Sequence, residues 1–129
     1  MSTCAGIAIK TEQGYKTIYC HCDGYPSYML KMLQENYNSE VLANNLINNG
    51  DASRIKKELD PVGRLHSFDR PEEDVCVFYY RDRQQPWNEC RPDYFKTKKE
   101  LQAVYYYTYI FADGCWTGYK DGRKVTIFL

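Results

Sequence analysis

The sequence predicts an α+β protein in which a mainly antiparallel sheet of about six strands carries two to three helices packed on one face. Three observations predict this: apolar and polar residues alternate near both ends of the chain, helical spacing occupies residues 27–48, and the elements follow the order ββααβαβββ. That order contains few parallel crossovers. A length of 129 residues fits one compact core, so we expect a single α+β domain over residues 1–129.

The first two elements are predicted to form a β-hairpin. Apolar and polar residues alternate over residues 4–10, and a second run of this kind follows a turn and covers residues 15–21. The second run ends at the sequence DGYP, where Pro26 can occupy the first turn of a helix. We therefore expect the strand to end and a helix to begin at this point.

Two amphipathic helices are predicted next, at residues 27–37 and 40–48, where apolar residues recur at spacings of three and four. They should form an antiparallel pair. Asp51 can cap a short third helix over residues 52–58, which Pro61 would end.

The middle of the chain alternates between loops and regular elements. Residues 61–74 and 82–96 show no clear period and are predicted to be long loops, whereas VCVFYYR at residues 75–81 is predicted to be a strand. Thr97, with Glu three positions later, matches a capping box and predicts a helix over residues 98–104.

Two Asp-Gly turns divide the remaining residues into three antiparallel strands. We expect these strands at residues 106–111, 115–119 and 124–129.

The composition limits the classes of partner. Lys plus Arg and Asp plus Glu both number 17, so we expect no general coating of nucleic acid and no membrane binding. The chain shows neither a signal-peptide pattern nor a long apolar run, so we expect a cytoplasmic protein whose six cysteines are reduced. Its 13 tyrosines suit protein interfaces and ligand walls, although a Tyr-rich sheet without a ligand explains them equally well.

A metal site is one interpretation of the sequence Cys20-His21-Cys22. Strand alternation places the two thiols on one face and the imidazole on the other, so a zinc site would need His66 or Cys76 as a further ligand. The stronger interpretation is two thiols in a core and one partly exposed histidine. We expect no metal and no cofactor.

Cysteine catalysis is a second interpretation, because Cys22 precedes a predicted helix and His21 or His66 could act as its base. No recognised catalytic cysteine motif surrounds it. We therefore expect no catalytic residue here.

A nucleotide pocket is a third interpretation. Arg81 and Arg83 could hold phosphates while Tyr79 or Trp87 stacks on a base, because guanidinium groups grip phosphates in pairs of hydrogen bonds. The alternative is that both arginines pair with surface carboxylates such as Asp82. The sequence has no glycine-rich phosphate loop of the ATP-binding or NAD-binding type.

Three segments carry a resemblance: IYCHCDGYPSYM at residues 18–29, HSFDRPEEDVCVFYYRDR at 66–83 and YYTYIFADGCWTGY at 106–119. The chain resembles a family of small uncharacterised bacteriophage and prophage proteins with an H-x-D-G-Y-P motif. The resemblance implies a phage accessory protein that acts in the host cell cytoplasm, by blocking a host protein or by sequestering a signalling nucleotide.

Our leading hypothesis is therefore a non-enzymatic anti-defence protein that binds and inhibits a host factor or sequesters a host signalling nucleotide. One alternative is a small metal-dependent hydrolase or nuclease that uses His21, Asp23 and His66. Another is a phage structural protein that self-associates as a homodimer. The predicted ligand-binding residues are His21, Asp23, Tyr25, His66, Tyr79, Arg81, Arg83 and Trp87.

Overall fold

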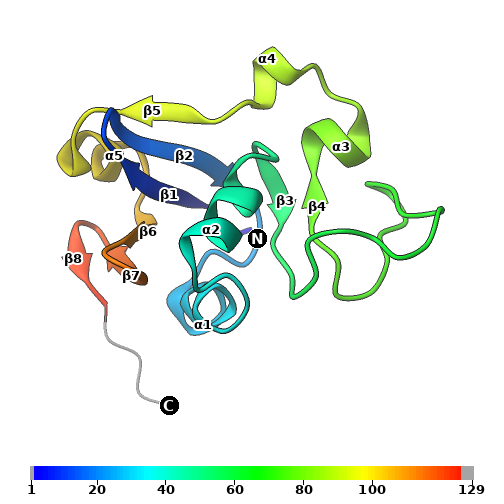
Figure 1. The fold of residues 1–129 in the computed structure, drawn as a ribbon, viewed down its shortest axis with the longest axis horizontal. Helices are drawn as coiled ribbons and strands as arrows, with labels where there is room; N and C mark the ends of the chain where they lie inside the picture. The colour runs from blue at the N-terminus through cyan, green and yellow to red at the C-terminus, as the bar shows by residue number, and fades with distance from the viewer. Residues whose placement is uncertain (1, 126–129) are drawn as a thin grey trace.

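The computed structural model describes residues 2–125. These residues form an eight-stranded sheet and five helices (Figure 1). The α+β class is confirmed. The strands are β1 (Ala5–Thr11), β2 (Gly14–Cys20), β3 (Ala52–Arg54), β4 (Val77–Phe78), β5 (Asp93–Phe95), β6 (Tyr107–Ala112), β7 (Cys115–Lys120) and β8 (Arg123–Lys124). The helices are α1 (Pro26–Asn36), α2 (Glu40–Ile47), α3 (Tyr79–Arg83), α4 (Trp87–Cys90) and α5 (Lys98–Val104).

The sheet is mixed, with more strands than the sequence predicts. Its strand order is β4-β3-β2-β1-β6-β7-β8. β5 is outside this order and pairs with β2. β1 runs parallel to β6 and β2 parallel to β3, while the other pairs are antiparallel. Parallel pairs are joined by long connections and leave no signal in local alternation, which is why the sequence did not reveal them.

The predicted N-terminal hairpin lies in the centre of the sheet. Ala5 pairs with Cys20 and Ile7 with Ile18, and all four side chains are buried. They belong to one cluster of buried residues that also includes the apolar faces of α1 and α2.

α1 and α2 lie together on this face of the sheet, as Figure 1 shows. Both helices are confirmed close to their predicted bounds. Their buried residues are Met29, Leu30 and Leu33 on α1 and Ala43, Leu46 and Ile47 on α2.

α5 packs on the opposite face of the sheet, so the prediction that the helices share one face is wrong for this helix. Its Leu101 forms a second buried cluster with Ala8 and Ile110. Gly6 and Ala8 make the outer face of β1 apolar and shallow, so both faces of this strand can be buried.

Side-chain caps start two of the helices. The Ser39 hydroxyl accepts a hydrogen bond from the backbone N–H of Leu42 (3.1 Å) at the start of α2. The Thr97 hydroxyl accepts one from the N–H of Glu100 (3.1 Å), which confirms the predicted start of α5.

The predicted short helix at residues 52–58 is wrong, because Ala52–Arg54 form strand β3. Asp51 does not cap a helix. Its carboxylate instead accepts a hydrogen bond from the backbone N–H of Tyr19 in β2 (2.9 Å). This long-range bond draws the segment onto the sheet.

The predicted strand at residues 75–81 is largely wrong, because only Val77–Phe78 are extended and α3 begins at Tyr79. The Asp82 carboxylate accepts the backbone N–H of Phe78 (2.8 Å). This local side-chain bond satisfies a donor at the helix start and turns the chain out of the sheet.

The predicted loop at residues 82–96 is also wrong in part, because it contains α4 and β5. Residues 61–74 are irregular, as predicted. The C-terminal hairpins are confirmed as β6, β7 and the first residues of β8, and residues 126–129 of the predicted last strand lie outside the described residues.

All six cysteines are free thiols. Within residues 2–125, no helix combines the length and the apolar character that crossing a membrane requires.

Candidate functional site

The side chains predicted to form one site lie in separate places. His66 and Arg81 meet around Asp82, Tyr79 and Arg83 flank Phe68, Trp87 contacts Tyr80, His21 contacts Tyr19, and Asp23 and Tyr25 belong to the turn before α1.

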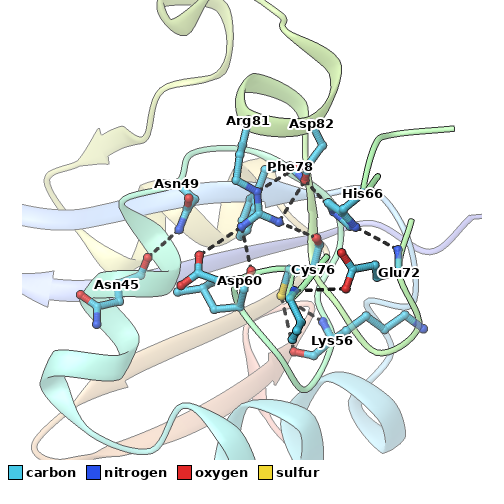
Figure 2. Close-up of polar contacts among 12 residues, drawn as sticks. Asn45, Asn49, Lys56, Asp60, His66, Glu72, Cys76, Phe78, Arg81 and Asp82 are labelled. Carbon is cyan, nitrogen blue, oxygen red and sulfur yellow. Dashed lines mark hydrogen bonds and ion pairs between the residues drawn. The ribbon is translucent and has the colours of Figure 1, made fainter. Parts of the chain in front are cut away.

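The partly exposed Arg81 guanidinium is held in place by four acceptor groups. Its Nε donates to Asp82 Oδ1 (2.9 Å) and its Nη2 to Asp82 Oδ2 (3.1 Å), so the two side chains form a paired interaction. Nη2 also donates to the carbonyl oxygen of Cys76 (2.8 Å), and Nη1 donates to that of Leu59 (2.7 Å). Figure 2 shows this guanidinium surrounded by its partners, with Asp60 on its outer side. Arg81 thus fastens α3 to the preceding loop.

His66 completes this internal network from the other side of Asp82. Its Nδ1 accepts the backbone N–H of Glu72 (2.9 Å), so in the neutral ring the proton is on Nε2, which lies 3.3 Å from Asp82 Oδ2. The side chains of His66 and Asp82 are only 2% and 4% exposed. His66 therefore stabilises the long loop rather than facing outward.

Phe68 joins two of the predicted residues on the surface. The Arg83 guanidinium lies 4.8 Å from the centre of the Phe68 ring, and the Tyr79 ring lies 5.5 Å away on the same residue. Burial raises the pKa of Tyr79, so its hydroxyl remains a neutral donor and acceptor.

Trp87 belongs to an exposed aromatic surface that we call the Trp87 patch, formed by Tyr80, Trp87, Arg91 and Tyr94. The rings of Tyr80 and Trp87 meet edge to face with centroids 5.0 Å apart. Trp87 is 39% exposed, Tyr80 50% and Tyr94 55%. Three large rings therefore face solvent within one short stretch of the chain, α3 to β5.

A cleft of about 440 Å³ opens in this patch. Tyr94 and Lys16 are cross-strand neighbours on β5 and β2, and the Trp87 ring lies close to Gly50, in the turn that follows α2. The Lys16 ammonium also donates to the side chain of Asn48. The cleft is lined by Lys16, Trp87, Arg91, Pro92, Asp93 and Tyr94.

His21 lies in a different group, the Cys4 cluster, which consists of Cys4, Tyr19 and His21. The Tyr19 hydroxyl lies 2.7 Å from His21 Nδ1 and 3.1 Å from Cys4 Sγ, while the sulfur and the imidazole nitrogen are 4.0 Å apart. Tyr19 lies on β2 and His21 is the first residue after it, so the two side chains, two positions apart, share a face. Burial and the hydrogen bond to Cys4 raise the pKa of Tyr19 above its usual range.

The DGYP sequence makes a tight connection between β2 and α1. Asp23 has a positive φ of 59°. A Cβ on Gly24 would lie 2.8 Å from the backbone of Cys4, and the Gly24 carbonyl accepts the Tyr109 hydroxyl (2.6 Å). Tyr25 is exposed beside the ring of Tyr28. The motif therefore has a structural reason, which is close packing of the turn against the start of β1.

The proposed metal-binding residues are not grouped. His21 and His66 lie in separate clusters, and among residues 2–125 no three His, Cys, Asp or Glu side chains are arranged to hold a metal ion.

Asp51 is a carboxyl group with a raised pKa that the sequence analysis did not single out for function. It lies beside β2, between the part of β2 that pairs with β5 and the end that pairs with β3. Burial raises its pKa to about 6, against the lowering effect of the Tyr19 N–H.

The sequence analysis also missed other residues of the Trp87 patch and of the Cys4 cluster. Cys4 could have been found, because extending the hairpin register by one pair places it opposite His21. Arg91 and Tyr94 could not, because residues 82–96 have no clear period and β5 follows from long-range pairing, and Tyr80 was assigned to a strand that in fact ends before α3.

Comparisons with protein-family models, with curated proteins and with solved structures find no match to this chain.

Proposed function

We propose that the protein is a non-enzymatic phage accessory protein that binds a host protein through the Trp87 patch and thereby inhibits it. The observation that carries this proposal is the grouping of exposed Tyr80, Trp87 and Tyr94 with Arg91 on one segment. Trp, Tyr and Arg are the residue types most enriched among interface residues that dominate binding energy.

The geometry of the patch supports a protein partner. Tyr80 and Trp87 restrict each other's rotamers through their edge-to-face contact, so less side-chain entropy is lost when a partner covers them. Arg91 is exposed at the end of α4, where it can donate hydrogen bonds to a partner's carboxylates or carbonyls.

The phage context comes from the resemblance carried by the H-x-D-G-Y-P motif and the two aromatic segments. That resemblance implies a small phage protein that acts on host machinery, including antiviral defence. Inhibition follows if the covered host surface is one that the host factor needs for its own activity.

Sequestration of a signalling nucleotide is the second candidate, and the cleft beside Trp87 favours it. Its volume of about 440 Å³ falls within the range of ligand pockets, roughly 300–1,000 Å³. Trp87 and Tyr94 offer rings for stacking, and Lys16 and Arg91 offer positive charge. Asp93 in the same lining opposes a phosphate, which is why we rank this candidate second.

Native mass spectrometry of the protein purified from bacterial cells separates these candidates. We expect a complex with one host polypeptide. A nucleotide-sized adduct would support the second candidate instead, and a homodimer without ligand would support self-association.

A further inference from the structure

The Tyr19 hydroxyl bridges a thiol and an imidazole, an arrangement that the proposed binding surface does not use. The chain from Cys4 Sγ through Tyr19 Oη to His21 Nδ1 has links of 3.1 Å and 2.7 Å. Both are hydrogen-bonding distances, because contacts to sulfur are longer than those to oxygen. Cys4 is exposed, so its sulfur can meet a reagent from solvent.

The hydrogen-bonded chain from Cys4 to His21 can carry a proton in either direction. In the first state, Cys4 donates to the Tyr19 oxygen and Tyr19 donates to His21. In the second state, the Cys4 proton has moved to Tyr19 and the Tyr19 proton to His21, which leaves a thiolate, a neutral phenol and an imidazolium. The phenol is neutral in both states, which agrees with the burial that holds Tyr19 in its protonated form.

We infer that Cys4 is a reactive-thiol site for small disulfides, in which His21 takes the thiol proton through the Tyr19 hydroxyl. The Cys4 thiolate attacks one sulfur of the disulfide, a new S–S bond forms to Cys4 and the old S–S bond breaks. The released thiolate receives the proton that His21 returns through Tyr19. The disulfide is the oxidant, and Cys4 ends as a mixed disulfide.

The groups around Tyr19 favour the neutral form of its phenol. The Tyr105 ring packs beside Tyr19 with centroids 6.5 Å apart, and Tyr79 and Cys20 are close enough that negative charge on either would raise the pKa of Tyr19. All three groups therefore favour a neutral phenol. This inference is independent of the Trp87 patch, because none of these residues belongs to it.

Cys115 provides an internal control for the reactivity of Cys4. It is the other exposed cysteine, and its sulfur lies 3.8 Å from the carbonyl oxygen of Ala112, an acceptor that cannot take up a proton. Iodoacetamide alkylation of the folded protein at neutral pH, followed by peptide mass spectrometry, gives the rate at each sulfur. We expect Cys4 to react at least about threefold faster than Cys115, because only Cys4 is hydrogen-bonded to a hydroxyl that can pass its proton on to an imidazole. Equal rates at the two cysteines in the unaltered chain would overturn the inference without any variant.

Two variants test the relay itself. Tyr19→Phe keeps the ring and removes the bridging hydroxyl, and His21→Gln removes the proton acceptor. Each should slow Cys4 to the rate of Cys115 and leave Cys115 unchanged, while the melting transition shows that the fold persists. Rapid alkylation of Cys4 in both variants would show that the relay does not activate the thiol.

The class of reaction partner is tested with oxidised glutathione as the probe. We expect a mixed disulfide at Cys4 that forms faster than at Cys115 and that Tyr19→Phe slows by the same factor as alkylation. Fast alkylation of Cys4 without a mixed disulfide would overturn small disulfides as its partner.

Discussion

The indole of Trp87 meets the phenol of Tyr80 edge to face, with ring centroids 5.0 Å apart, on a segment that has left the sheet. Tyr80 lies on α3 and Trp87 on α4. Figure 1 shows these two helices between strands β4 and β5. The contact fixes two exposed rings relative to each other before any partner arrives. Such pre-organisation is what an interface needs if its energy is to come from a few side chains.

Gly50 packs closely against Trp87 and the Cys90 carbonyl. We therefore predict that Gly50→Ala is more destabilising than Gly114→Ala. Both glycines have positive φ, +80° and +82°, so the backbone strain of the two substitutions is matched. A Cβ at Gly50 would overlap the carbonyl oxygen of Cys90 and lie 3.0 Å from Trp87, whereas a Cβ at Gly114 meets nothing within 4 Å. We expect a loss of about 1 kcal/mol for Gly114→Ala and about 1–2 kcal/mol more for Gly50→Ala. Urea unfolding measures both, and equal losses would contradict this role of Gly50.

Arg81 and Arg83 are predicted to behave differently although they are two positions apart. Arg81→Ala leaves the Asp82 carboxylate, whose side chain is 4% exposed, without its paired guanidinium. We expect a loss of about 2–3 kcal/mol, below the cost for a fully buried pair because Arg81 itself is partly exposed. Arg83→Ala removes only a surface contact with Phe68 and should cost less than about 1 kcal/mol. Similar unfolding midpoints for the two variants in urea would refute the structural role of Arg81.

Asp51 is predicted to make stability fall as pH rises through the range of about 4 to 6. Its pKa is about 6 in the folded protein, compared with about 3.9 for an unperturbed carboxyl group, so the folded state binds this proton more tightly. Below about pH 4 both states are protonated. Above about pH 6 both are ionised, and the folded state then bears the cost of a desolvated charge.

Asp51→Asn isolates this effect, because an amide oxygen can still accept the Tyr19 N–H. We expect the variant to gain about 1 kcal/mol over the unaltered protein at pH 7, after allowance for solvent screening, and to lose this advantage at pH 4. The measurement is the free energy of unfolding of both proteins from pH 4 to 8. A difference that does not change with pH would contradict the raised pKa.

Local patterns predicted the parts of the fold that local interactions determine. The spacing of Met29 and Leu33 gave α1, and the hydroxyl of Thr97 gave the start of α5. The central hairpin was also readable, because its alternation and its turn lie within one short segment.

The errors arose where a side-chain hydrogen bond, distant or local, overrides the preference indicated by the residue pattern. Asp51 looks like a helix cap, yet its carboxylate bonds the backbone of Tyr19 across the sheet. Tyr79 continues a strand-like pattern, yet Asp82 starts a helix at that residue by accepting the N–H of Phe78. The residues predicted for one site lie apart for a related reason, since Arg81 also bonds the carbonyl of Leu59 in a loop that is distant in sequence.

The most direct test of the Trp87 patch is quantitative capture of a host protein from bacterial lysate with matched variants. Tyr106→Ala is the control, because Tyr106 is 54% exposed and lies outside the patch. We predict one host protein that the unaltered protein and Tyr106→Ala bind equally and that Trp87→Ala binds about 30-fold more weakly, the loss of a residue worth about 2 kcal/mol. A host protein retained equally by all three, or none retained by any, would contradict the proposal.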